Sequence, residues 1–132
     1  MFVDASAIVA MITEEADATD LSARLDRSAI RVTSPVSVFE AAVAVARVLA
    51  LAPSDASELV GDFLELTSIA VLPLPVEAAA IAIDTFARYG KGPRHPAQLN
   101  MGDCFSYACA RHHGYPFLCK GADFAQTDID PA

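Results

Sequence analysis

Four short apolar runs alternate with longer segments of helical character, and this alternation limits the fold more than any other feature of the chain. The runs are Phe2 to Asp4, Ile30 to Thr33, Ile69 to Leu72 and Phe117 to Cys119. Each is too short for a buried helix and has the length of a buried strand. Strands that alternate with helices predict a mostly parallel sheet, with right-handed crossovers that place helices on both faces. We therefore expect an α/β fold, a three-layer α/β/α sandwich with a mostly parallel central sheet of four or five short strands.

Capping residues and glycines mark the helix boundaries. Ser34-Pro35 is a typical helix entry, and Gly90 and Gly114 stand where helices end. The polar stretch from Lys91 to Gln98 is predicted to be a loop, and Thr127 to Ile129 is a candidate for a short edge strand. The expected helices are Ala5 to Thr13, Glu14 to Arg27, Val36 to Leu51, Pro53 to Leu66, Val76 to Tyr89 and Met101 to His113.

Length and composition predict one domain with an apolar interface. A chain of 132 residues without a linker or repeat is expected to form a single domain over residues 1 to 132. The hydrophobic fraction of 54% and the mean hydropathy of +0.38 are high for a small soluble protein, so a lone monomer is not expected.

Charge placement and cysteine usage predict a cytoplasmic protein. No run of eighteen apolar residues lacks a charge or Pro, and no basic region precedes the apolar start, so neither a membrane span nor a signal peptide is expected. The three cysteines are odd in number and scattered, which fits reduced buried thiols better than a disulfide framework.

Four acidic residues occur at the ends of these apolar elements or within them. Asp4 and Asp123 follow short apolar strands, Glu40 lies inside an apolar helix, and Asp103 opens another. In parallel sheets functional groups gather at the carboxyl ends of the strands, so all four acids are expected at one edge of the sheet.

Each acid also has a purely local explanation. Asp4 fits an N-cap, Ser37 to Glu40 matches a capping box, Asp103 fits a first-turn acid and Asp123 a turn residue. Taken together, however, four carboxylates in one cleft would repel one another, and bound cations are the simplest remedy.

Oxygen ligands of this kind favour Mg²⁺ or Mn²⁺, and such ions suit phosphodiester hydrolysis. Ser6, two residues beyond Asp4, is a candidate to hold a ligand carboxylate or a metal-bound water, or else is a plain helix-start Ser. Asn100 is a candidate N-cap or substrate contact, and the cap is the preferred interpretation.

Several separated motifs resemble the PIN-domain ribonucleases, specifically the VapC-type toxins of bacterial type II toxin-antitoxin systems. The motifs are the opening Phe2-Val-Asp-Ala-Ser-Ala-Ile-Val, the helix with Glu40, Leu99-Asn-Met-Gly-Asp-Cys-Phe-Ser-Tyr-Ala, and Phe117-Leu-Cys-Lys-Gly-Ala-Asp-Phe-Ala-Gln-Thr-Asp-Ile. They stand in the family's order and span nearly the whole chain, and agreement of several spaced blocks is far more specific than any one of them.

This resemblance implies a PIN-like fold and a Mg²⁺-dependent endoribonuclease with ligands matching Asp4, Glu40, Asp103 and Asp123. It also implies a homodimer and a cognate VapB-type antitoxin whose C-terminal segment blocks the acidic cleft. Many relatives carry two acids in the Gly-x-Asp-Phe segment, whereas Ala122 leaves only Asp123 here. Asp128 is therefore an alternative fourth acid.

The net charge of −8 argues at first against a nucleic-acid partner. The four acids supply half of that charge, and bound cations would reverse their local effect. RNA would then be attracted by the metals and by a basic rim, for which Lys91, Arg94 and Lys120, with His95 and Arg111, are candidates. An antitoxin arginine would find a bidentate partner among the acids.

Three other interpretations compete with this one. Cys109 with His112 and His113 suggests zinc, but these residues do not complete a tetrahedral set. A phospho-receiver domain needs paired acids after the first strand, which Val3-Asp4-Ala5 lacks. A PIN-fold module that binds RNA or a partner without cleavage remains the alternative function.

Overall fold

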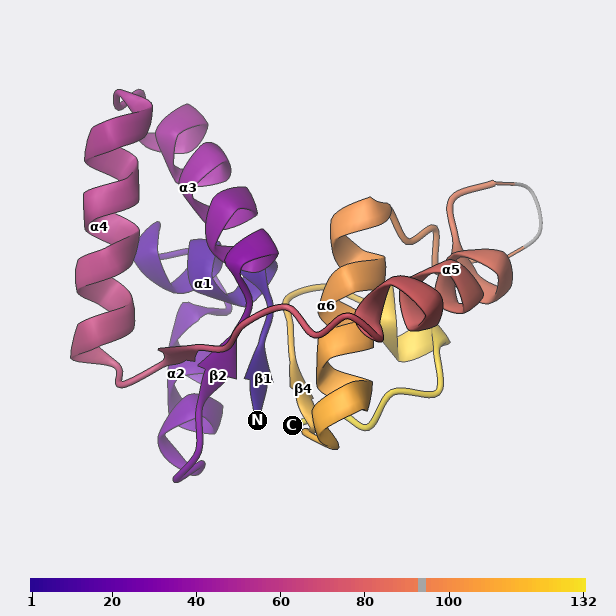
Figure 1. The fold of residues 1–132 in the computed structure, drawn as a ribbon. Coiled ribbons are helices and arrows are strands. Elements are labelled where there is room, and N and C mark those ends of the chain that lie inside the picture. Colours follow the sequence, from indigo (N-terminus) through magenta and orange to yellow (C-terminus); the bar gives the residue numbers. More distant parts are fainter. Residues whose placement is uncertain (93–94) are drawn as a thin grey trace.

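The computed structural model describes residues 1–92 and 95–132 and contains a central sheet of four parallel strands in the order β3-β2-β1-β4 (Figure 1). The sequence prediction of an α/β fold with a parallel sheet is thereby confirmed. The elements in chain order are β1 (Phe2–Val3), α1 (Ala5–Ile12), α2 (Ala18–Asp26), β2 (Val32–Thr33), α3 (Pro35–Leu49), α4 (Pro53–Leu66), β3 (Ala70–Val71), α5 (Ala78–Tyr89), α6 (Met101–His113), β4 (Phe117–Leu118) and the 3-10 helix η1 (Phe124–Gln126).

Alternate residues of the short strands point into two separate cores, which makes the molecule three-layered. Val3 and Leu118 pack with helices α1 to α4, whereas Phe2 and Phe117 pack with α5, α6 and η1. The rings of Phe2 and Phe117 stack with centroids 5.6 Å apart, as expected for neighbours in register. Because side chains alternate along a strand, two-residue strands are sufficient to join both helical layers.

The α1–α2 connection differs from the prediction. A helix was expected from Glu14 to Arg27, but α2 begins at Ala18. Glu14 has a positive φ of 53°, a left-handed conformation that interrupts a helix, and Glu15 then accepts a hydrogen bond from the Ala18 N–H. Residues 13–17 therefore form a turn that brings Glu15 toward the carboxyl ends of the strands.

The α3 cap also differs from one local explanation. Ser34 is the N-cap and accepts a hydrogen bond from the Ser37 N–H at 3.2 Å, with Pro35 in the first turn. The capping box expected over Ser37 to Glu40 does not form, because the helix already begins one turn earlier. Glu40 is therefore free of any capping role.

The candidate edge strand at Thr127 to Ile129 is wrong. Thr127 instead closes η1, where its hydroxyl donates to the Phe124 carbonyl at 2.7 Å. Beyond Ile129 the chain forms an isolated bridge between Phe117 and Pro131. Its two hydrogen bonds are made by the neighbours of Pro131: the Phe117 N–H donates to the Asp130 carbonyl, and the Ala132 N–H donates to the Phe117 carbonyl.

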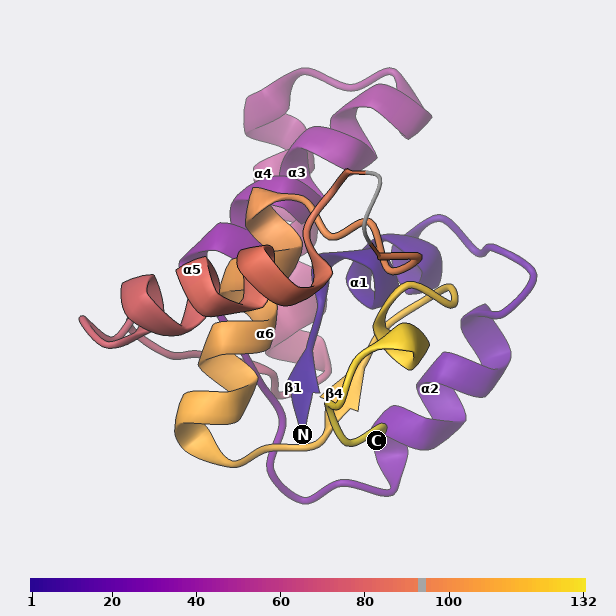
Figure 2. The ribbon, with the colours of Figure 1, turned by 90° about the vertical axis from the view of Figure 1, so that its right-hand side faces the viewer.

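Both termini lie at the amino-end side of the sheet (Figures 1 and 2), where Arg24 of α2 donates two hydrogen bonds to the Ala132 carbonyl. All three cysteines are free thiols, as expected. In the described part of the chain no single helix is long and apolar enough to cross a membrane; only α3 and α4 taken together reach that length, and they are bent by 118°.

Candidate active site

Asp4 lies at the carboxyl end of β1, in the middle of the sheet. It is only 2% exposed, and its N–H donates to the Leu118 carbonyl of β4. Its side chain caps α1: Oδ2 accepts hydrogen bonds from the Ser6 N–H at 3.0 Å and from the Ser6 hydroxyl at 2.6 Å. The N-cap explanation is therefore correct, and it fixes the carboxylate at the edge of the sheet.

Glu40 extends to the same edge of the sheet from α3, the helix that directly follows β2. Its side chain is half-buried and lies against Gly102, where any Cβ would overlap the Glu40 carboxylate. Burial, reinforced by the nearby charges of Asp4 and Asp103, raises the pKa of Glu40 to about 7. A carboxylate of this kind has too few stabilising partners in the protein alone.

Asp103 is in the first turn of α6 and forms a capping box with Asn100. The Asn100 Oδ1 accepts from the Asp103 N–H at 3.0 Å, and Asp103 Oδ2 accepts from the Asn100 N–H at 2.8 Å. Burial raises the pKa of Asp103 to about 6 against the lowering effect of that hydrogen bond, and the charges of Asp4 and Asp123 add to the rise. The preferred interpretation of Asn100 as a cap agrees with this geometry.

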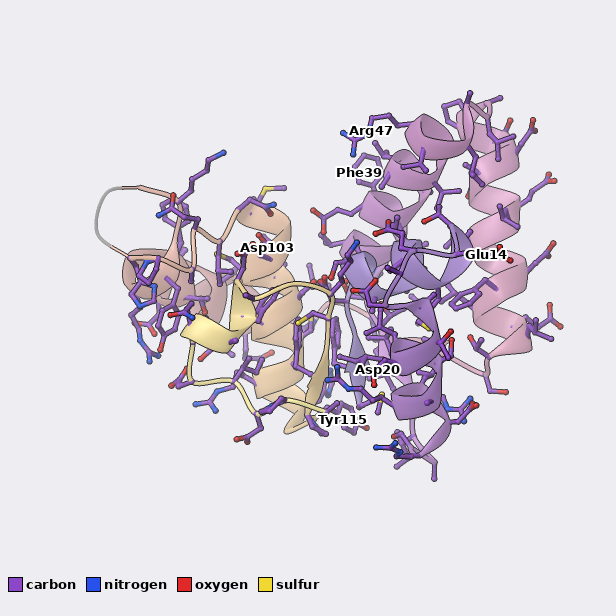
Figure 3. All side chains as sticks on the ribbon, turned by 180° about the vertical axis from the view of Figure 1, so that it is seen from behind. Glu14, Asp20, Phe39, Arg47, Asp103 and Tyr115 are labelled. Atoms are coloured by element: carbon purple, nitrogen blue, oxygen red, sulfur yellow. The ribbon has the colours of Figure 1, made fainter. Side chains whose placement is uncertain are left out.

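These three acids line one cavity of about 360 Å³ at the carboxyl ends of the strands. Figure 3 shows Asp103 on α6 at one side of this region and Phe39, the neighbour of Glu40, on α3 at the other. The complete lining is Asp4, Ala5, Ser6, Val9, Glu15, Glu40, Ala44, Asp103 and Lys120.

The two candidates for the fourth acid lie in different surroundings. Asp123 is exposed at the start of η1, close enough to Asp103 for its charge to raise the pKa of Asp103. Asp128 accepts hydrogen bonds from the Tyr107 hydroxyl at 2.5 Å and from Arg88 at 2.9 Å, and these contacts hold its pKa well below the usual range. Asp123 is thus not among the residues that line the cavity, although its charge reaches Asp103, whereas Asp128 is engaged elsewhere.

Lys120 is the basic residue that lines the acidic cavity. Its ammonium pairs with Glu15 and lies 3.9 Å from Asp17, and its backbone N–H donates to the Ser6 hydroxyl at 3.0 Å. Ser6 therefore connects Lys120 to Asp4 through consecutive hydrogen bonds, which is more than a plain helix-start Ser would do.

The other candidate cations lie away from the cavity. Lys91 and His95 line a separate depression beside α5, and Arg111 is 3.8 Å from Asp128. Arg94 is outside the described residues.

Sequence reasoning missed two residues of this site. Glu15 was placed inside a helix, and its position on the cavity depends on the turn at residues 13–17. Gly102 was quoted only as part of a motif, although a glycine in the first turn of an otherwise ordinary helix costs stability relative to alanine, which is a signal of close contact.

The donor set fits a hard divalent cation. Within residues 1–92 and 95–132, no three His, Cys, Asp or Glu side chains lie as a group that could hold a metal ion by themselves, so water would have to complete the coordination. Mg²⁺ needs only one or two carboxylates and keeps several waters, so Asp4, Glu40 and Asp103 around one cavity meet its requirements. The zinc alternative is less well matched, because Cys109 is buried, whereas His112 and His113 are exposed and pack edge to face on each other.

Comparison with known proteins agrees with this geometry. Residues 1–130 match the family model for the PIN domain. The chain is 40% identical over 139 residues to a VapC ribonuclease of Rhizobium meliloti (strain 1021), covering 97% of this chain and 98% of the relative. It is 39% identical over 133 residues to ribonuclease VapC42 of Mycobacterium tuberculosis (strain ATCC 25618 / H37Rv), covering 100% and 98%.

A solved structure agrees at the level of the fold. The crystal structure of Mycobacterium tuberculosis VapC20, described as a Sarcin-Ricin loop cleaving toxin, superposes with a TM-score of 0.75 at 17% identity, covering 99% of this chain and 97% of that one. Because the family model and the relatives cover this chain almost from end to end, the resemblance seen in the sequence is confirmed, and the chain belongs to the PIN-domain family of VapC ribonucleases.

Proposed function

We propose that this protein is a Mg²⁺-dependent endoribonuclease toxin of a toxin-antitoxin module, in which Mn²⁺ can replace Mg²⁺. The observation that carries the proposal is the meeting of Asp4, Glu40 and Asp103 on one cavity, where burial and mutual repulsion raise the pKa values of Glu40 and Asp103. A bound cation would stabilise the charged form of these carboxylates, and membership of a ribonuclease family indicates that the reaction is RNA cleavage.

Each acid has a distinct part in the proposed site. Asp4, fixed by Ser6, and Asp103, fixed by Asn100, hold the metal from two elements, and Glu40 holds it from α3. Asp123 is proposed as the fourth acid in preference to Asp128, whose carboxylate is already occupied by Tyr107 and Arg88. These residues would hold a divalent ion, which would supply Lewis acidity toward water and toward the leaving oxygen of a phosphodiester.

RNA binding is proposed to involve Lys120 at the rim of the cavity. Its ammonium pairs with Glu15, and an RNA phosphate, which is negatively charged like Glu15, would compete for this ammonium. The surrounding acids disfavour RNA at long range, so binding depends on the local pairing of Lys120 and on the metal.

The proposed protein partners are a VapB-type antitoxin and a second copy of this chain, in the cytoplasm. An antitoxin arginine inserted into the cavity would form charge-assisted hydrogen bonds with the carboxylates that line it. The second copy is proposed to cover the apolar groove between α5 and α6, where Ile83, Phe86 and Met101 are 72%, 52% and 71% exposed.

Cleavage of RNA by the purified protein, with and without metal, tests this proposal. We expect cleavage with Mg²⁺ or Mn²⁺, none with a chelator, and none in Asp4→Asn. Asparagine is as good an N-cap as aspartate, so the variant keeps α1 intact and its loss of activity reports the missing charge. Asp20→Asn, at an exposed position on α2, is the matched control and keeps wild-type activity.

The alternative function, a PIN-fold module that binds without cleavage, makes the opposite prediction. It requires RNA or antitoxin binding with no metal-dependent cleavage in any condition. Full cleavage and growth toxicity in Asp4→Asn would refute the proposed metal site.

A further inference from the structure

A group of buried hydroxyls lies in the core beneath the acidic cavity. Ser34, Ser37 and Ser106 are each at most 1% exposed, and in the described part of the chain the other buried polar or charged side chains are Asp4, Thr33 and Thr85. Buried polar groups are tolerated when they are hydrogen-bonded, but a core of this kind does not need them. Their presence at the contact between two helices requires an explanation.

The hydroxyls form a chain that crosses from α3 to α6. Ser34 Oγ lies 3.0 Å from Ser37 Oγ, and Ser37 Oγ lies 3.1 Å from Ser106 Oγ. The first contact belongs to the start of α3, whereas the second joins residues 69 positions apart in the sequence. The Ser37–Ser106 hydrogen bond is therefore a direct polar link between the two helices.

This link stands one helical turn from two of the metal-binding acids. Glu40 follows Ser37 by three residues on α3, and Asp103 precedes Ser106 by three residues on α6. Residues three apart share a helix face, so Glu40 and Asp103 lie on the same facing surfaces as the linked serines. A shift of one helix against the other at the serines moves one acid relative to the other.

Gly102 adds a second constraint at the level of the acids themselves. The Glu40 carboxylate occupies the space that a Cβ at Gly102 would need, so the Glu40 side chain of α3 lies against the backbone of α6 at this point. The serine link fixes the helices below the cavity, and the bare backbone of Gly102 receives the Glu40 carboxylate beside Asp103.

We propose that Ser37, Ser106 and Gly102 are positioning residues that set the place of Glu40 relative to Asp103. The inference rests on the proposed metal-dependent ribonuclease function and extends it to residues that do not contact the ion or the RNA. A directional hydrogen bond restricts the sliding of one helix along another more than the apolar contact of an alanine pair does.

The stability of a double variant separates positioning from ordinary packing. Replacing both partners of a buried hydrogen bond by apolar groups is nearly neutral for folding, unlike removal of one partner. In Ser37→Ala/Ser106→Ala we therefore expect a urea midpoint close to that of the wild type. Loss of a group that orients metal ligands typically costs about 10-fold to 100-fold in metal affinity or activity.

The experiment measures Mn²⁺ affinity by electron paramagnetic resonance without RNA, and kcat and KM for RNA cleavage with Mn²⁺. We expect the double variant to bind Mn²⁺ about 10-fold more weakly and to lose kcat by a similar factor, with KM unchanged because Lys120 is untouched. Thr85→Val is the control. Thr85 is 1% exposed, and its hydroxyl donates within its own helix to the Ile81 carbonyl, its one hydrogen bond among the described residues.

Gly102→Ala is the second variant, and the same measurements on it test the inference if the double variant fails to fold. Alanine favours a helix over glycine, so weaker Mn²⁺ binding in a protein of undiminished stability reports displacement of Glu40. Wild-type Mn²⁺ affinity and kcat in either folded variant, or an equal loss in Thr85→Val, overturns the inference. Absence of Mn²⁺ binding and cleavage in the wild type instead refutes the proposed function.

Discussion

The metal-free protein is expected to lose stability as the pH rises from about 4.5 to about 7, and Glu40 is the main reason. The pKa of Glu40 is about 7 in the folded protein, against an ordinary value of 4.5. Between these values the folded protein holds a proton that the unfolded chain has released. The folded state thus binds more protons, so the free energy of unfolding decreases with rising pH throughout this window.

The size of the effect follows from the pKa difference. A rise from 4.5 to about 7 corresponds to at most about 3.5 kcal/mol. Glu40 is only half-buried and shares its charge interactions with Asp4 and Asp103, so solvent screening reduces this figure by about half, to roughly 1.5 kcal/mol. For a domain of this size that is a decrease of about 5 °C in Tm.

Urea unfolding at pH 5, 6 and 7 in the presence of a chelator measures the effect. Glu40→Gln cannot release the proton, so the difference in stability between variant and wild type should grow in the variant's favour by roughly 1 kcal/mol from pH 5 to pH 7, because part of the effect is already present at pH 5. Glu58→Gln, at an exposed position on α4, is the matched control and should follow the wild type. Mn²⁺ at 100 times its dissociation constant should restore about 2.7 kcal/mol to the wild type at pH 7. Parallel pH profiles for wild type and Glu40→Gln would refute the reasoning.

Three shorter predictions concern the surroundings of the acids. Asp123→Asn should lower kcat about 10-fold or more. Asp128→Asn should leave kcat near wild type and lower Tm instead, because it removes the charge that contacts Tyr107 and Arg88. The reverse pattern in a cleavage assay would make Asp128 the fourth acid. Lys120→Ala should raise KM for RNA and make KM less dependent on salt concentration, with Mn²⁺ affinity unchanged. An unchanged KM would exclude a contact between Lys120 and an RNA phosphate. Ile83→Glu places a charge in the apolar groove between α5 and α6 and should shift the protein from dimer to monomer in analytical ultracentrifugation. A variant that stays dimeric would show that the dimer forms through another surface.

Much of the fold was predictable from local patterns. Ser34-Pro35 marked the start of α3, Gly114 the end of α6, and the short apolar runs marked all four strands. These signals are local, since capping and periodicity act within a few residues. Two predicted elements were wrong for local reasons that periodicity does not report: Glu14 adopts a left-handed conformation, and the Thr127 hydroxyl closes a turn on the Phe124 carbonyl.

The sequence alone therefore indicated the family of this protein, through acidic residues at the ends of apolar elements in motifs that match the VapC ribonucleases. Tertiary structure decided which groups act together. The placement of Glu40 against Gly102, the pairing of Lys120 with Glu15, and the engagement of Asp128 by Tyr107 all join residues distant in the chain. Periodicity assigns a residue to a face of its own helix or strand, but only the packing of one element on another determines which faces meet.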